Sequence, residues 1–113
     1  MNRPDLQNNL ILHMTSYNKL VRDRIPEILN KKGILYEQRV ANQGEYKVEL
    51  IKKLQEEIDE FTENPTSEEL ADIKEVVLAL ETLAEYKETE EVRSKKKEEM
   101  GGFERRLILK GEK

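Results

Sequence analysis

The chain has 113 residues, a length that fits one domain with a modest core. Charged residues make up 39% of it, against about 25% in average globular proteins, yet 20 basic and 24 acidic side chains leave a net charge of only −4. This balance argues against a basic nucleic-acid-binding protein and against a strongly charged disordered chain. It favours amphipathic helices with charged outer faces, and the absence of cysteine excludes disulfides and thiol chemistry.

Apolar runs in the sequence are short. None approaches the roughly 20 residues that a membrane span needs, and none has the form of a signal peptide. We therefore expect a cytoplasmic protein without membrane contacts. Residues 1–15 are predicted to form a flexible leader, and residues 16–113 a single helical domain.

The first predicted elements are a short helix and a strand. Pro26 fits the first position of a helix over 26–32, and Gly33 fits a left-handed cap at its end. Residues 34–40 alternate apolar and polar side chains, which predicts a strand. Asn42 and Glu45 then form a capping box that opens the next helix.

Two long helices follow. The first ends at Asn64-Pro65. Its apolar residues recur at helical spacing and are expected to face the core: Leu50, Ile51, Leu54, Ile58 and Phe61. The second begins near Thr66 or Ser67 and runs to about Tyr86. Because so few residues link them, we expect the two helices to pack as an antiparallel hairpin.

The C-terminal part contains a third predicted helix, which opens at Thr89 and stops at Gly101-Gly102. Residues 103–110 alternate weakly and are a candidate partner for the strand at 34–40. The sequence thus predicts an all-α protein with at most a short two-stranded ribbon.

Negative charge is concentrated in residues 45–72, which hold 3 basic and 10 acidic side chains, a net of −7. At about 100° per residue, Glu57 and Glu60 lie beside the apolar face of the first long helix. Glu69 falls in the middle of the apolar stripe of the second, with Asp72 beside it. In a packed hairpin these four carboxylates would converge at one end, where a cation such as Mg²⁺ would offset their repulsion.

Two plainer interpretations stay open. Glu69 follows Thr66 by three residues, so it fits a capping box at the start of its helix. The acidic residues of the first long helix, Glu56 among them, also fit an ordinary solvated face.

The acidic motifs carry a family resemblance. Glu56-Glu57-Ile58-Asp59-Glu60 followed by Glu69-Leu70-Ala71-Asp72 resembles the EExxE…ExxD signature of MazG-like, all-α nucleoside triphosphate pyrophosphohydrolases. Tyr17 to Pro26 resembles the opening of a small branch often labelled phosphoribosyl-ATP pyrophosphohydrolase-like, and the likeness extends over residues 16–110. It implies a helical bundle that hydrolyses nucleoside triphosphates to monophosphate and pyrophosphate, in house-cleaning of nucleotide pools. It also implies a homodimer or homotetramer.

The resemblance assigns roles to individual residues. Four carboxylates would bind Mg²⁺, with Mn²⁺ as an alternative: Glu57, Glu60, Glu69 and Asp72. The chemistry of hydrolysis, apart from the resemblance, calls for a carboxylate not fully committed to metal that orients or deprotonates the attacking water, and we expect Glu57 or Glu56 in this role. Three basic residues would hold the substrate phosphates: Lys53, Arg93 and Lys97. The basic N-terminal set of Lys19, Arg22 and Arg24 is a second candidate for phosphate contact, or else a surface patch.

Two other functions fit the same sequence. One is the phosphoribosyl-ATP pyrophosphohydrolase of histidine biosynthesis, which has similar acidic motifs. The other is a non-catalytic helical assembly or adaptor module. An active metal site predicts that Mg²⁺ stabilises the protein, whereas the adaptor module predicts no such effect. No nucleic-acid polymer is expected as a partner.

Overall fold

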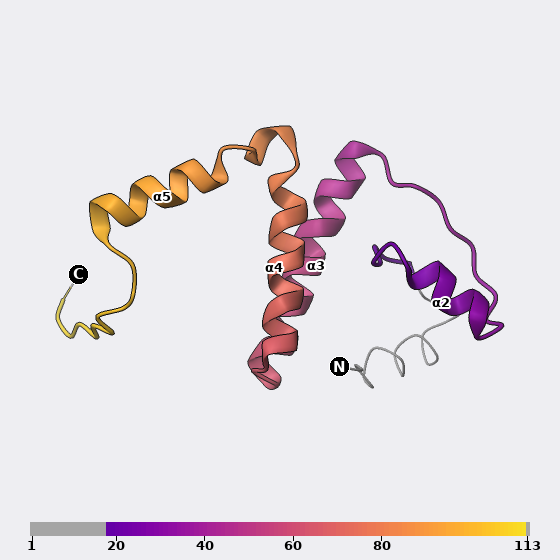
Figure 1. Cartoon of the computed structure of the whole chain (residues 1–113), viewed down its shortest axis with the longest axis horizontal. Coiled ribbons are helices and arrows are strands. Elements are labelled where there is room, and N and C mark those ends of the chain that lie inside the picture. The colour runs from indigo at the N-terminus through magenta and orange to yellow at the C-terminus, as the bar shows by residue number, and fades with distance from the viewer. Residues whose placement is uncertain (1–17, 113) are drawn as a thin grey trace. The chain divides into compact units, whose positions relative to one another are not determined.

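The computed structural model of the protein describes residues 18–112 (Figure 1). Within this range it contains four α-helices, one short 3₁₀ helix and no strand, so the all-α prediction is confirmed. The predicted leader at 1–15 lies outside the described residues. The chain divides into two compact units, one up to Leu80 and one from Glu81 onward. No helix in the described range is long and apolar enough to cross a membrane.

Helix α2 spans Ile25–Lys31, close to the predicted 26–32, with proline in its first turn. Gly33 adopts a φ of +69°, the left-handed conformation predicted for the cap. Its N–H donates to the carbonyl of Asn30 at 3.1 Å, and that of Ile34 donates to Leu29 at 3.0 Å. Ile34 also packs against the buried side chains of Ile25 and Leu29. Capping bonds and apolar contact together end the helix.

The strand predicted over 34–40 is wrong. The segment has no regular secondary structure and forms no ladder, and Leu35 and Val40 are 88% and 94% exposed. Residues 103–110 form no strand either, so the ribbon is absent from the described chain. A strand needs a neighbour that pairs with its backbone groups and a core that covers one face. Alternation in the sequence supplies neither.

Helix α3 spans Gln43–Glu63 and begins as predicted at Asn42, whose side chain accepts a hydrogen bond from the Glu45 N–H at 2.9 Å. The second half of the predicted capping box differs. The Glu45 carboxylate accepts two hydrogen bonds from Arg39, at 2.6 and 2.5 Å. This pairing lowers the pKa of Glu45, because Arg39 stabilises the charged form.

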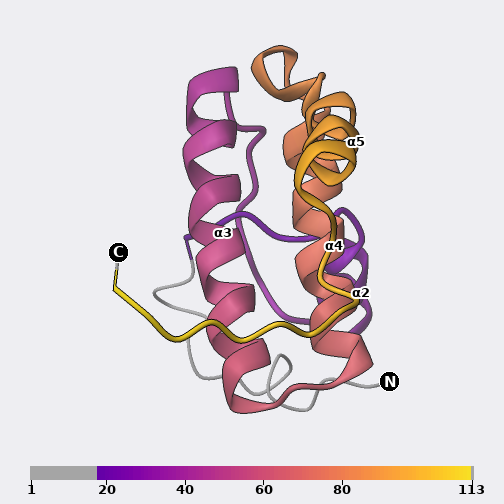
Figure 2. The same cartoon turned by 90° about the vertical axis from the view of Figure 1, so that its left-hand side faces the viewer.

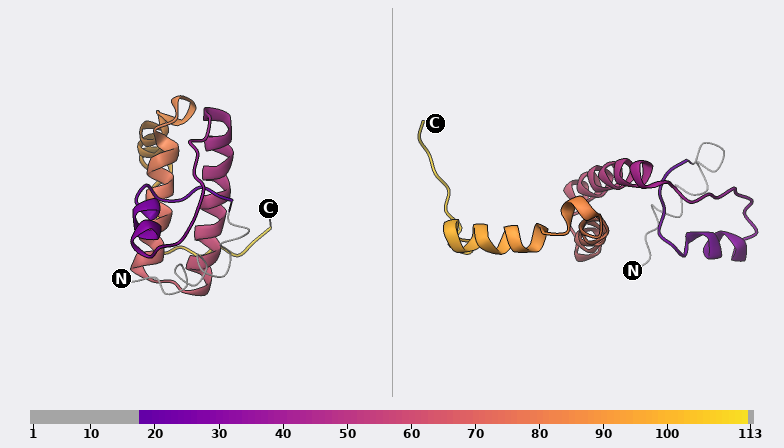
Figure 3. Two further views of the ribbon diagram at one scale, coloured as in Figure 1. Left: turned by 90° about the vertical axis from the view of Figure 1, so that its right-hand side faces the viewer. Right: turned by 90° about the horizontal axis from the view of Figure 1, so that it is seen from above.

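Helix α4 spans Ser67–Glu81 and lies beside α3, running in the opposite direction after a short connection (Figure 1, Figure 2). Figure 3 shows the same pair from two further sides. The buried side chains of α3 and α4 are Leu50, Glu57, Glu69, Asp72 and Val76. Three of these five are acidic, so the seam between the helices is apolar at one end and carboxylate-rich at the other.

The α4 helix ends at Glu81, earlier than the predicted Tyr86. Leu83 is extended, with ψ of 140°, and a 3₁₀ helix, η1, follows at Ala84–Tyr86. Apolar residues keep their helical spacing through this break, and no glycine or proline marks it. The periodicity therefore predicted a longer helix than the structure has.

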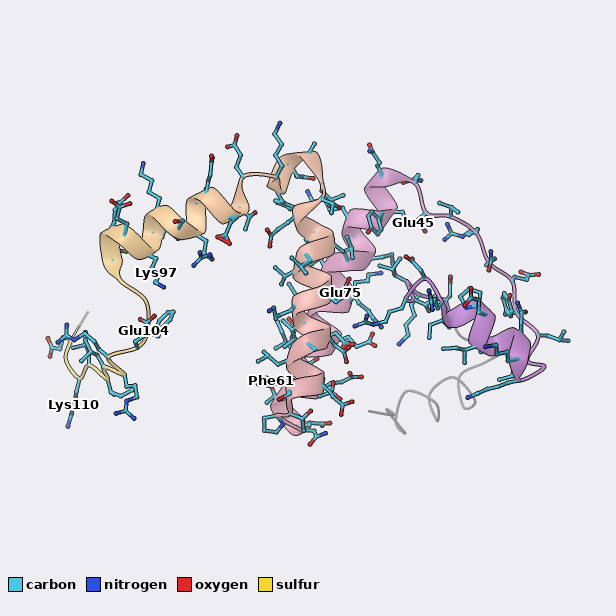
Figure 4. The ribbon with its side chains drawn as sticks, in the orientation of Figure 1. Glu45, Phe61, Glu75, Lys97, Glu104 and Lys110 are labelled. Carbon is cyan, nitrogen blue, oxygen red and sulfur yellow. The ribbon has the colours of Figure 1, made fainter. Side chains whose placement is uncertain are left out.

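The second unit contains helix α5, Thr89–Met100, with the predicted start and a stop at Gly101, where φ is +83°. No residue of α5 is buried. Lys97 in its last turn lies 3.7 Å from a carboxylate oxygen of Glu104; Figure 4 labels both side chains.

Candidate metal centre

The acidic residues meet where α3 ends and α4 begins. Glu57 and Glu60 stand three residues apart in the last two turns of α3. Glu69 and Asp72 stand three residues apart in the first two turns of α4. Residues at i and i+3 share a helix face, and the short connection sets the two faces against each other.

Five carboxylates form two groups that share Glu57. In one group, ligand oxygens of Glu57, Glu69 and Asp72 all lie within 4.8 Å of one another. In the other, the same holds for Glu56, Glu57 and Glu60. The structure therefore brings three of the four predicted metal ligands into one group, and it places the fourth, Glu60, with Glu57 and Glu56 in the other.

Burial distinguishes the first group from a solvated acidic face. Glu57 and Glu69 are 2% exposed and Asp72 is 9% exposed. Gathering buried carboxylates is costly unless positive charge or hydrogen bonds compensate. The donors are all carboxylate oxygens, the hard ligands that Mg²⁺ and Mn²⁺ accept. The residues present thus fit a divalent cation of this kind.

Glu69 fits both interpretations of its position, helix capping and membership of the carboxylate cluster. Its backbone N–H donates to the Thr66 hydroxyl at 3.3 Å, as helix capping requires. Its side chain is buried, and its carboxylate belongs to one group with those of Glu57 and Asp72. Capping therefore accounts for the backbone of Glu69, and the carboxylate cluster accounts for its side chain.

Within residues 18–112, three basic side chains form ion pairs with carboxylates of the cluster. Arg22 Nη2 donates to Asp72 Oδ1 at 2.7 Å. Lys19 Nζ and Lys53 Nζ donate to Glu56 Oε1 at 3.0 and 3.3 Å. Burial acts to raise the pKa of Glu56, but the hydrogen bond from Lys19 and the charge of Lys53 outweigh it and leave the pKa below its ordinary value. Glu56 is consequently ionised at neutral pH.

The other predicted phosphate contacts are Arg24, Arg93 and Lys97. Arg24 is exposed. Arg93 and Lys97 belong to the second unit, where Arg93 pairs with Glu90 at 2.6 Å. The roles of Arg93 and Lys97 in binding phosphates stay predictions.

Sequence reasoning named every acidic member of the cluster but missed its pairing with the N-terminal cations. Lys19 and Glu56 are 37 positions apart, and Arg22 and Asp72 are 50 apart. Contacts at such separations arise from tertiary packing, and no local spacing signals them. Lys19 and Arg22 both contact the acidic cluster, and their role in binding phosphates stays a prediction.

Comparison with known proteins adds no relative to this picture. No family model, no curated protein and no solved structure matches the chain. The functional interpretation accordingly depends on the residues and on the geometry just described.

Proposed function

We propose that the protein is a Mg²⁺-dependent hydrolase that cleaves nucleoside triphosphates into nucleoside monophosphate and pyrophosphate. The observation that carries this proposal is the buried group of Glu57, Glu69 and Asp72, with ligand oxygens within 4.8 Å of one another. The order of the acidic motifs supports the same activity through the family resemblance. We also propose that the helices of this protein form an antiparallel hairpin within a bundle, as in the all-α pyrophosphohydrolases.

The metal would be held by the oxygens of the buried group, and Glu60 extends the donor set on the side of Glu56. When bound, Mg²⁺ neutralises phosphate charge and makes a coordinated water more acidic. All further contributions come from side chains of the chain itself.

Glu56 has the position and the charge needed to orient the attacking water. It borders the cluster, is ionised at neutral pH and can accept a hydrogen bond from water in that state. Lys19 and Lys53 hold its Oε1 in place. Because proximity and orientation supply much of the rate in phosphoryl chemistry, a carboxylate fixed in this way is useful even with a low pKa.

The three bordering cations would offset the negative charge of the substrate. A triphosphate brings several negative charges to a site already rich in carboxylates. Each of the three pairs with a carboxylate of that site: Lys19 and Lys53 with Glu56, and Arg22 with Asp72. Arginine and lysine on phosphate oxygens lower the cost of charge accumulation during cleavage.

Self-association belongs to the proposal as well, as a homodimer or homotetramer. Ile51 and Ile58 on α3 and Leu70 on α4 are 48%, 39% and 47% exposed. Half-exposed apolar side chains on neighbouring helices are typical of surfaces that pair with a second copy. Sedimentation equilibrium would show a dimer or tetramer, whereas a monomer at all concentrations would contradict this part.

The activity is tested by product analysis. Purified protein, Mg²⁺ and a panel of canonical and modified triphosphates, with phosphoribosyl-ATP included, are expected to yield monophosphate and pyrophosphate. Glu57→Ala and Asp72→Ala should lose at least about a hundredfold in rate, since each removes a metal ligand. Asp59→Asn is the matched control, because Asp59 is an exposed carboxylate on the same helix.

The outcomes separate the candidate functions. Pyrophosphate release that fails in the two ligand variants and persists in the control supports the proposal. A kinetic preference for phosphoribosyl-ATP would assign the enzyme to histidine biosynthesis. If no triphosphate is cleaved, or if the ligand variants keep full activity, the proposed activity is wrong. Absence of Mg²⁺-dependent stabilisation would then favour the assembly module.

A further inference from the structure

Arg22 stands apart from the other cations at the cluster. Its guanidinium bonds directly to Asp72, a member of the buried group, whereas Lys19 and Lys53 contact the peripheral Glu56. The pair joins the segment before α2 to the first turns of α4, across 50 positions of sequence. Arg22 therefore occupies a carboxylate that the proposed function requires for metal.

Asp72 and Arg22 differ in how freely their side chains can move. Asp72 is buried within a helix, and its position is fixed by α4. Arg22 lies outside any helix and its side chain is 53% exposed. Its hydrogen bond to Asp72 uses Nη2, and the described residues show no other side-chain bond of Arg22. Arg22 is thus the partner able to move, with guanidinium donors still available.

A guanidinium and a divalent cation compete for Asp72 through charge, because both are stabilised by the same carboxylate. A guanidinium released from Asp72 would remain at the rim of the cluster, tethered through its short segment. Its fork of N–H donors matches two phosphate oxygens, which is the geometry that favours arginine over lysine at phosphate sites.

We propose that Arg22 couples metal and substrate binding. Its guanidinium neutralises Asp72 in the metal-free protein and transfers to the triphosphate when a divalent cation takes over Asp72. The inference rests on the proposed function, since it assumes that the cluster binds metal and that the substrate is a triphosphate. It makes Arg22 a substrate-binding residue whose availability depends on the metal.

The test measures binding and needs no turnover. Isothermal titration gives the affinity for Mn²⁺ alone, and then the affinity for the α,β-methylene analogue of ATP at saturating Mn²⁺. Arg22→Gln should bind Mn²⁺ about tenfold more tightly than the wild type, because one competing positive charge is gone. The same variant should bind the analogue about tenfold more weakly, through the loss of charge-assisted hydrogen bonds.

Two further variants serve as a control and as a test of the guanidinium geometry. Arg39→Gln is the matched control, since it removes an arginine paired with a carboxylate, Glu45, elsewhere in the same unit. Both of its affinities should stay within about twofold of the wild type. Arg22→Lys retains the charge without the fork, so it should keep the wild-type Mn²⁺ affinity and still lose affinity for the analogue. This variant also serves if Arg22→Gln does not fold.

Opposite results overturn the inference. A merely supporting role, in which Arg22 orients Asp72 as a ligand, predicts that Arg22→Gln binds Mn²⁺ more weakly. Unchanged affinity for the analogue in Arg22→Gln and Arg22→Lys would likewise refute transfer to the phosphates. If the wild-type protein binds no Mn²⁺, the proposed function itself fails. If instead the wild type and Arg22→Gln bind Mn²⁺ with equal affinity, the metal site stands and only the role of Arg22 is refuted.

Discussion

Neutralising Glu57 is expected to stabilise the metal-free protein while abolishing its response to Mg²⁺. Glu57 belongs to both carboxylate groups, so Glu57→Gln relieves repulsion in each and conserves side-chain size. Two unit charges 4.8 Å apart, the largest separation within each group, repel by about 3.5 kcal/mol at an effective dielectric constant of about 20, and the neighbouring cations reduce the net repulsion. We expect the free energy of unfolding in EDTA to rise by about 1–3 kcal/mol.

Urea denaturation followed by circular dichroism measures both effects. The wild-type protein should gain about 2–3 kcal/mol when Mg²⁺ is present at about 100 times its dissociation constant, and Glu57→Gln should gain none. Asp59→Asn makes the same change of charge at an exposed position, where the carboxylate accepts a hydrogen bond from Gln55 at 3.0 Å, and should match the wild type in both conditions. The reasoning is refuted if Glu57→Gln is less stable than the wild type in EDTA and is stabilised equally by Mg²⁺.

Three smaller predictions use the same denaturation assay. Lys19 and Lys53 lower the pKa of Glu56 below 4.5 against the opposing effect of burial, so its contribution to stability is present above that pH and is lost as the pH falls through the folded-state pKa. Glu56→Gln should therefore cost about 0.5–1 kcal/mol at neutral pH, and this cost should disappear as the pH falls through the folded-state pKa of Glu56; a constant difference across pH would contradict this. Asn42→Ala should cost about 1 kcal/mol through the lost N-cap bond, and a neutral result would argue against that cap. Gly33→Ala should cost about 1 kcal/mol because φ is +69°, whereas a gain would mean that the turn relaxes.

Helix ends were predictable where a local residue sets them. The caps at Asn42, Gly33 and Gly101 depend on side-chain or backbone properties within a few positions. The end of α4 at Glu81 has no such residue, and the periodicity carried the prediction beyond it. The strand over 34–40 failed for the complementary reason, because pairing depends on a distant partner that local alternation does not reveal.

The acidic half of the site followed from helical geometry, and its basic half did not. Periodicity placed Glu69 within an apolar stripe, where it is indeed buried. The same reasoning placed Glu57 only beside the stripe of α3, because Ile51 and Ile58 were counted as core. Both are half-exposed, and the buried face is rotated toward Glu57. Arg22 reached Asp72 through tertiary packing, which spacing along one helix does not encode.

The claim that the buried carboxylates hold a divalent cation is tested most directly by crystals of the wild-type protein grown with Mn²⁺. Anomalous diffraction near the manganese edge locates each ion without reference to activity. We expect a peak within coordination distance of carboxylate oxygens of Glu57, Glu69 and Asp72. Well-ordered density for the three side chains with no anomalous peak between them, at Mn²⁺ concentrations that populate other sites, would contradict it.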